Sequence, residues 1–486
     1  MSGNINSNSN RSVTTPYVSL EIQGGPSEQA IHDKNDDLTS LAVGSLTSVQ
    51  TADGIHDLPG YIIICAVILI GDMSRGMMFP TMWPLVESLG GTTVTLGYAV
   101  AAYSLGRIMS SPIFGAWSTT MGTKKTLQYS TGLLTLAFFT YAQVPKVGRP
   151  FFLIFSQTLV GAGSGSSGAT RAFVADATAT RQRTRYIAIT TAVQYGGFTV
   201  TPFLGAFISH IFQDKEYQFG FFLLNKFTVP GYFMCILSSG VFLLLSTVFV
   251  ERQRPIPILS LTSPKTSKPA KSSKRTMIDE IANTTTFLGL TTYDTCLLGC
   301  MLLNVATKGS IASFETIGIN YAETQFGMKA ELAGSIVATC GTVGVLSLLC
   351  MAHLSETFTD VQLITGGMAV TIGSMVCLCF VSEDTQDNET WKYSLAMFMM
   401  YSVGYPIGHT AVIGLFSKIV GRRKQGTLMG WFSASGSAAR ILCAIITGYV
   451  TNYASIDTLF FILMAILTTA IIFTITARKT LGLLSL

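Results

Sequence analysis

The stretch MGWFSASGSAARIL, residues 429–442, places a charged side chain inside a strongly apolar segment that continues as CAIITGYV. A helix needs about 20 apolar residues to cross a bilayer, and a helix through this segment would hold Arg440 near its middle. A guanidinium at the bilayer centre costs about 2.5–3.5 kcal/mol on insertion scales, so it normally faces a partner or water. The stretch therefore indicates a membrane span that borders a polar interior.

The composition of the whole chain agrees with a membrane protein. Of its 486 residues, 49% are hydrophobic and only 12% are charged, and the mean hydropathy is +0.47. Soluble domains carry about 25% charged residues. The net charge of +5 is spread over loops rather than gathered in one basic patch, which argues against nucleic acid as a partner.

Apolar segments recur along the chain and predict an all-α membrane protein with twelve transmembrane helices. The predicted spans are 61–85, 94–118, 126–144, 151–174, 186–211, 229–250, 291–318, 330–352, 361–381, 393–417, 427–450 and 457–477.

A Pro-, Ser- and Lys-rich segment at 251–286 divides these spans into two sets of six and predicts a cytosolic linker. The predicted halves are 61–250 and 287–477. Residues 1–60 are rich in Ser, Asn, Gly and Asp and predict a disordered cytosolic tail. Residues 478–486 form a second short cytosolic tail.

The orientation in the membrane follows from basic residues in short loops. They gather after the second, fourth and tenth spans: Lys124 and Lys125; Arg181, Arg183 and Arg185; Arg422, Arg423 and Lys424. Both termini are therefore expected in the cytosol. The sequon at Asn388 falls in a loop on the other side, where it can accept a glycan.

Two spans share a local pattern, GRIMSSPIFG at 106–115 and ARILCAIITG at 439–448. In both, an Arg is followed by Ile, and a Gly lies eight residues after the Arg. A related pattern, GGFTVTPFLG, occurs at 196–205. Internal repeats of three helices are typical of secondary transporters, so Arg107 and Arg440 are expected at corresponding places in the two halves.

Several ionisable residues fall inside the predicted spans: Asp72, Arg75, Arg107, Arg171, Lys308, Glu315, His409 and Arg440. One interpretation is that they form structural ion pairs between helices. The basic members outnumber the acidic ones, however, so pairing alone does not satisfy them. The surplus indicates a cavity of positive potential suited to a small anionic solute. Asp72, Glu315 and His409 are candidates for proton coupling.

A resemblance to the major facilitator superfamily lies in GAWSTTMGTKK at 115–125. Gly115, Gly122, Lys124 and Lys125 match the loop signature of that superfamily, while Thr119 stands where it usually has Asp. Further segments resemble the lysosomal family associated with neuronal ceroid lipofuscinosis: LGYAVAAYSLGRIMSSPIFGAWS (96–118), SFETIG (313–318), LFSKIVG (415–421) and QGTLMGWFSASGSAARIL (425–442).

This resemblance implies two pseudo-symmetric six-helix halves, alternating access and an endolysosomal (lysosomal, late endosomal or vacuolar) membrane. It also implies that spans one, four, seven and ten line a central cavity. The first-ranked pathway residues are therefore Asp72, Arg75, Arg171, Glu315 and His409. Arg107, Lys308 and Arg440 rank second.

The expected function is a secondary active transporter of a small anionic solute, with protons or chloride as further candidate ions. The alternatives are an anion channel of the chloride type on the same fold, or a non-transporting scaffold or receptor. No hydrolytic constellation, metal-ligand spacing or cofactor motif stands out in the sequence, so an enzyme is not expected.

Overall fold

The computed structural model describes residues 57–212, 216–220, 222–251, 289–379, 390–421 and 425–485. All of them belong to one unit, Ile55–Leu486. Four predicted features lie wholly or almost wholly outside the described residues: the tail before residue 57, the linker after Glu251, the sequon at Asn388, and the basic loop 422–424.

The first half consists of helices and one short hairpin. Its elements are α2 (Leu58–Gly76), α3 (Phe79–Ser88), α4 (Thr93–Thr120), α5 (Thr123–Ala142), α6 (Val144–Val147), α7 (Pro150–Gly163), η1 (Ser164–Ser166), α8 (Ser167–Ala177), η2 (Thr180–Gln182), α9 (Arg183–Ile211), β1 (Tyr217–Phe219), β2 (Phe222–Leu224) and α10 (Val229–Thr247).

The second half is helical throughout its described residues. Its elements are α12 (Thr292–Phe326), α13 (Ala330–Thr357), α14 (Asp360–Cys379), α15 (Thr390–Met397), the π-helix η5 (Phe398–Gly404), α16 (Tyr405–Val420), α17 (Gln425–Tyr453), α18 (Ile456–Thr476) and α19 (Arg478–Leu484).

Each predicted span coincides with a helix or with consecutive helical segments. Within the described ranges, eight helices meet the length and hydropathy expected of a membrane span. The span from 291 to 318, which is rich in Thr, Asn and Ser, is the 35-residue helix α12. The short antiparallel pair β1–β2 was not predicted; it lies in the connection between α9 and α10.

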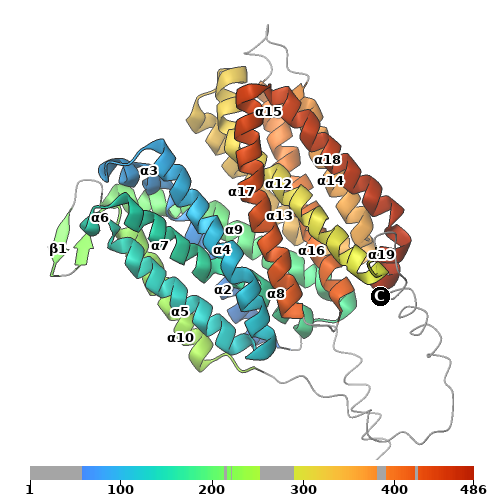
Figure 1. Cartoon of the computed structure of the whole chain (residues 1–486), viewed down its shortest axis with the longest axis horizontal. Coiled ribbons are helices and arrows are strands. Elements are labelled where there is room, and N and C mark those ends of the chain that lie inside the picture. The colour runs from blue at the N-terminus through green and yellow to red at the C-terminus, as the bar shows by residue number, and fades with distance from the viewer. Residues whose placement is uncertain are drawn as a thin grey trace, which may run out of the picture. The chain divides into compact units, whose positions relative to one another are not determined.

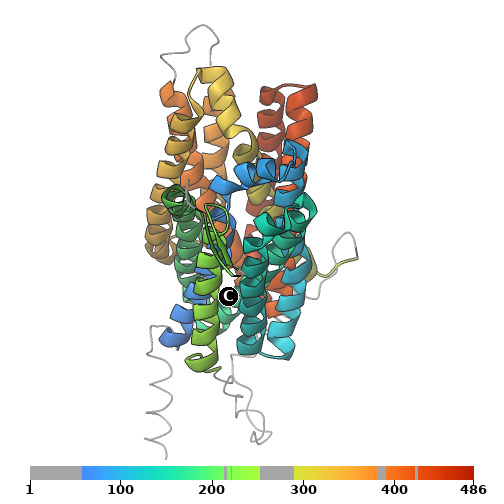
Figure 2. The same ribbon diagram turned by 90° about the vertical axis from the view of Figure 1, so that its left-hand side faces the viewer.

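The helices form two bundles that meet along α4 with α17 and along α9 with α13. Figure 1 shows the first half in blue to green and the second in yellow to red, with α17 beside α4. Figure 2 shows the helices of both halves running roughly along one common direction. We call the end that holds Thr120, Glu251 and Gln425 the linker end, and the opposite end, which holds β1–β2, the hairpin end.

Glycines let α4 and α17 approach closely near the linker end. A Cβ added at Gly115 would lie 2.4 Å from the carbonyl oxygen of Gly426, and one added at Gly430 would lie 2.5 Å from that of Ser111. Real side chains do not tolerate such distances from backbone atoms, so only glycine fits here. The Gly115 of the loop signature therefore acts as a contact point between the halves.

Polar contacts also join the halves at the linker end. Thr184 of α9 donates to Asp360 Oδ1 of α14 at 2.8 Å. Within the second half, Lys418 Nζ of α16 lies 2.7 Å from Asp360 Oδ2. Arg183 donates to the carbonyl of Ser417 at 3.0 Å, and Arg185 pairs with Glu356 at 2.6 Å.

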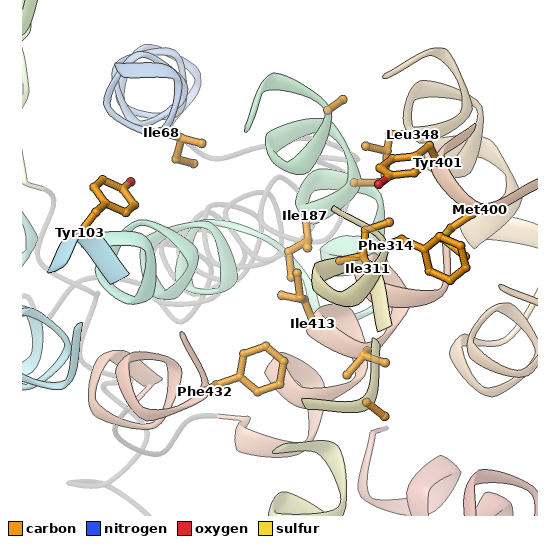
Figure 3. Close-up of a cluster of buried hydrophobic side chains, with 14 of the residues drawn as sticks. Ile68, Tyr103, Ile187, Ile311, Phe314, Leu348, Met400, Tyr401, Ile413 and Phe432 are labelled. Atoms are coloured by element: carbon orange, nitrogen blue, oxygen red, sulfur yellow. The ribbon is translucent and has the colours of Figure 1, made fainter. Parts of the chain in front are cut away.

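Buried apolar side chains pack on the hairpin side of these contacts. Ile187 of the first half and Ile413, Ile311 and Phe432 of the second are all buried, and Figure 3 shows Ile187 facing Ile413. Together with the glycine and polar contacts, this cluster closes the linker end.

Replacing Gly430 by Ala should destabilise the protein, because the added methyl would meet the backbone of Ser111. Overpacking of this kind costs about 1–3 kcal/mol. Thermal unfolding in detergent measures the effect. Gly448→Ala is the matched control on the same helix, because a Cβ there meets nothing within 4 Å. Equal unfolding temperatures for the two variants would refute the close packing described here.

Candidate functional site

A cavity of about 560 Å³ lies between the two halves. Its wall includes every ionisable residue that the sequence singled out inside the spans: Asp72, Arg75, Arg107, Arg171, Lys308, Glu315, His409 and Arg440. The residues that the sequence ranked first for the pathway and those that it ranked second all lie in this cavity wall. Spans two and eleven, which carry Arg107 and Arg440, therefore line the cavity together with spans one, four, seven and ten.

The carboxylate of Glu315 joins three helices. Its Oε2 lies 3.2 Å from Arg75 Nη2 of α2, and its Oε1 lies 2.8 Å from Arg440 Nη2 of α17. All three side chains are partly buried, with exposed fractions between 21 and 26%. Since Arg75 belongs to the first half and Glu315 to the second, this charge-assisted contact links the halves across the cavity.

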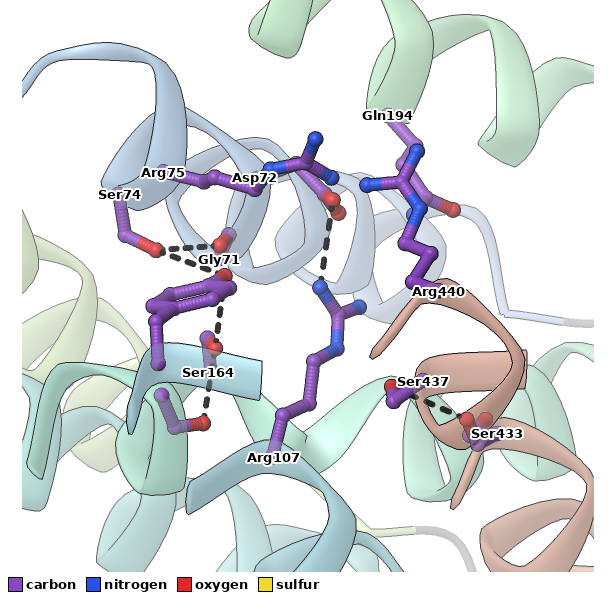
Figure 4. A network of polar contacts seen from close by, with 12 residues as sticks. Gly71, Asp72, Ser74, Arg75, Arg107, Ser164, Gln194, Ser433, Ser437 and Arg440 are labelled. Atoms are coloured by element: carbon purple, nitrogen blue, oxygen red, sulfur yellow. Dashed lines mark hydrogen bonds and ion pairs between the residues drawn. The ribbon is translucent and has the colours of Figure 1, made fainter. Parts of the chain in front are cut away.

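A second ion pair lies within the first half. Arg107 Nη1 of α4 is 3.6 Å from Asp72 Oδ1 of α2, and both side chains are 13% exposed. Figure 4 shows the guanidinium groups of Arg75, Arg107 and Arg440 directed toward the same space near Asp72. All three of these ion pairs run between helices.

Two cations in the wall, Arg171 and Lys308, form no ion pair within the part of the chain that the structure describes. Arg171 Nη2 donates to Gln194 Oε1 at 3.1 Å. Among the residues that the structure describes, no carboxylate oxygen lies within 4.0 Å of Arg171 or of Lys308. Their positive charges repel each other and are partly offset by the carboxylate of Asp72. An anionic ligand would relieve this repulsion.

His409 is buried between polar and aromatic neighbours. Its Nδ1 lies 3.1 Å from Thr307 Oγ1, and its ring stacks on Tyr405 with centroids 5.1 Å apart. Tyr405 in turn lies 6.2 Å, centroid to centroid, from Tyr195 of the other half. Aromatic rings from both halves thus border the charged part of the cavity.

Gly122 and Lys124 of the loop signature are supported by a carboxylate from elsewhere in the chain. Gly122 has a φ of 91°, and α5 begins directly after it. Glu251 accepts hydrogen bonds from the backbone N–H groups of Thr123 and Lys124 at 2.6 and 3.3 Å. An anion at a helix N-terminus is favourable. Lys125 lies exposed in the first turn of α5.

Thr119, which replaces the usual Asp of the signature, makes a neutral contact instead. Its Oγ1 lies 3.4 Å from Thr427 Oγ1 of α17. The link between α4 and α17 at this point is therefore a hydroxyl pair rather than a charged one.

Sequence reasoning missed the aromatic part of the wall and the contact between Gly436 and Lys308. Tyr195, Phe198 and Tyr405 line the cavity, but aromatic residues in apolar spans carry no distinguishing pattern. Gly436 lies against Lys308, where an added Cβ would be 2.9 Å from Nζ and 2.6 Å from Cδ. The small-residue run in 429–442 was a signal for close packing, but not for a contact with this lysine.

Comparison with known families gives one broad match. The family model described as Major Facilitator Superfamily matches residues 64–384 and 297–481. Major facilitator superfamily domain-containing protein 8 of Xenopus laevis is 24% identical over 448 residues, covering 80% of this chain and 85% of that protein. Multidrug resistance protein 1 of Bacillus subtilis (strain 168) is 21% identical over 393 residues, covering 79% and 88%.

Solved structures share the fold. The human organic anion transporter MFSD10 (TETRAN) matches with a TM-score of 0.66 at 13% identity, covering 86% of this chain and 99% of that one. The proton:xylose symporter XylE matches with a TM-score of 0.63 at 13% identity, covering 86% and 95%. At these identities the likeness concerns the fold alone.

A double-mutant cycle on Arg75→Met and Glu315→Gln should give a coupling energy above about 1 kcal/mol, because the pair is partly buried and charge-assisted. The free energy of unfolding in detergent provides the measurement. The more exposed pair Arg185–Glu356 is the control and should couple by less than about 1 kcal/mol. A cavity pair that couples no more strongly than this control would contradict the role given to Glu315.

Proposed function

The chain belongs to the Major Facilitator Superfamily, and on that basis we propose that it is a secondary active transporter of a small anionic solute. Members of this superfamily are transporters rather than enzymes, and they move small solutes across the bilayer. The anionic substrate, the direction of transport and the membrane concerned are parts of the proposal.

The observation that carries the proposal is the charge of the cavity wall. Five basic side chains border the cavity against two carboxylates, and both carboxylates are already engaged with arginines. Such a wall attracts anions and repels cations. The fold neighbour MFSD10 is described as an organic anion transporter, which is consistent with an anionic substrate.

Alternating access explains the two kinds of contact between the halves. The linker end is closed by glycine packing and by the contacts of Asp360, while the cavity lies toward the hairpin end of these contacts. Transport requires the linker-end contacts to break, so that the cavity opens toward that end after it has been open toward the other. The Arg75–Glu315 pair lies across the cavity, so its making or breaking can accompany that change.

Asp72, Glu315 and His409 remain the candidates for proton coupling, because each is ionisable and borders the cavity. Protonation of Glu315 would weaken its contacts with both arginines. A proton gradient could in this way change the contact between the halves together with the affinity for the anion.

The linker end is proposed to face the cytosol, because Lys124, Lys125 and Arg181 lie there. With that orientation both termini are cytosolic and Asn388 is available for glycosylation on the opposite side. The resemblance noted in the sequence supports a lysosomal, late endosomal or vacuolar membrane as the location.

Flux of radiolabelled anions into liposomes that contain the purified protein tests this function. Arg171→Ala and Glu315→Gln should each reduce flux at least tenfold, because a charge-assisted hydrogen bond contributes about 1.5–3 kcal/mol. Arg149→Ala is the matched control, since it removes the same charge from an exposed site outside the cavity wall.

Two results would count against the proposal. If both cavity variants transport every anionic substrate at the wild-type rate, the site is wrongly assigned. If flux rises without saturation and without counter-transport, the protein is a channel rather than a carrier.

A further inference from the structure

Besides the Asp72–Arg107 pair, the charged residues of the cavity include two groups at different depths. Lys308 lies seven residues before Glu315 on α12, so its backbone is roughly 10 Å nearer the linker end. Gly436 likewise lies four residues before Arg440 on α17. Arg75, Glu315 and Arg440 form a compensated group toward the hairpin end. The deeper group, Lys308 and Arg171, lies toward the closed linker end, and among the described residues it has no carboxylate oxygen within 4.0 Å.

The absence of a side chain at Gly436 leaves room for the end of the Lys308 side chain. A side chain at residue 436 would occupy the space of the lysine Cδ and Nζ atoms. The amide nitrogen of the neighbouring Asn304 donates to the carbonyl of Phe432 at 2.7 Å and to Ser435 Oγ at 3.0 Å, while its Oδ1 has no hydrogen-bond partner among the described residues. Lys308 Nζ lies beside α17 at Gly436, and among the described residues it makes no hydrogen bond or ion pair, so its donors remain available to a ligand.

Apolar and aromatic side chains border the same cavity. Tyr195 and Tyr405 approach each other from opposite halves, and Phe198 lies with its ring 4.5 Å from the Arg75 guanidinium carbon. All three line the cavity, whose volume of about 560 Å³ is much larger than an inorganic ion needs. A chloride ion would leave the cavity-facing surface of these rings uncovered, whereas an organic body would cover it.

We propose, building on the anion transport argued above, that the solute is an amphipathic organic anion. Its anionic head group binds between Lys308 and Arg171, and its apolar body lies along Tyr195, Phe198 and Tyr405. Gly436 is a positioning residue, because it acts by leaving room for the lysine ammonium.

Equilibrium binding to the purified full-length protein in lipid nanodiscs tests this proposal. The probes are chloride, acetate, hexanoate and 2-naphthoate, which carry the same charge on bodies of increasing apolar surface, together with the neutral 2-naphthamide. We expect hexanoate or 2-naphthoate to bind at least tenfold more tightly than acetate and chloride. 2-Naphthamide should bind at least tenfold more weakly than 2-naphthoate.

Variants separate the head-group site from the aromatic wall. Lys308→Gln and Gly436→Ala should each weaken binding of the tightest probe about tenfold, while Gly448→Ala should leave it unchanged. In the Lys308→Gln background, Gly436→Ala should add no further loss, which distinguishes positioning of the lysine from general damage to the fold. Phe198→Ala should weaken binding of the larger anions but not that of acetate.

The outcomes distinguish this inference from the proposed function. If chloride and acetate bind as tightly as the larger anions, and Lys308→Gln weakens them all, the amphipathic substrate is refuted while anion transport stands. If 2-naphthamide binds as tightly as 2-naphthoate, the head-group site is refuted. If neither Lys308→Gln nor Arg171→Ala changes the affinity for any of the anions, the proposed function is refuted as well.

Discussion

The carboxylate of Glu315, shared between Arg75 and Arg440, is the contact on which the organisation of the cavity depends. A single acid compensates one cation from each half of the molecule. Without it, two guanidinium groups would face each other across a partly buried space, which is strongly unfavourable. The contact therefore links the halves at the cavity, and the proposed anion site is formed by the two cations outside the ion pairs, Lys308 and Arg171.

The complementary constraint lies at the linker end, where backbone meets backbone. Gly115 and Gly430 allow the backbones of α4 and α17 to come into contact. Asp360 accepts a hydrogen bond from Thr184 of the first half and pairs with Lys418 of the second. Close apolar packing is lost over a short separation. In the proposed transport cycle, closure at this end is therefore made or broken as a unit.

The membrane spans and the charged residues of the cavity could be predicted from the sequence. Apolar length located the spans because a bilayer imposes a minimum helix length, and the cost of intramembrane charge singled out Asp72, Arg107 and the other cavity residues. The ion-pair partners could not be predicted, since Arg75 and Glu315 are 240 positions apart and helical periodicity reports only neighbours on one helix. The support of α5 by Glu251 and the contact of Gly436 with Lys308 depend likewise on how separate helices meet.

The surplus of basic side chains in the wall predicts that the cavity selects solutes by negative charge. The most direct measurement exposes liposomes containing the purified protein to a whole-cell metabolite extract and identifies, by mass spectrometry, the compounds that enter only in its presence. The account predicts that these compounds are organic anions. Selective entry of neutral or cationic compounds, with anions excluded, would contradict it.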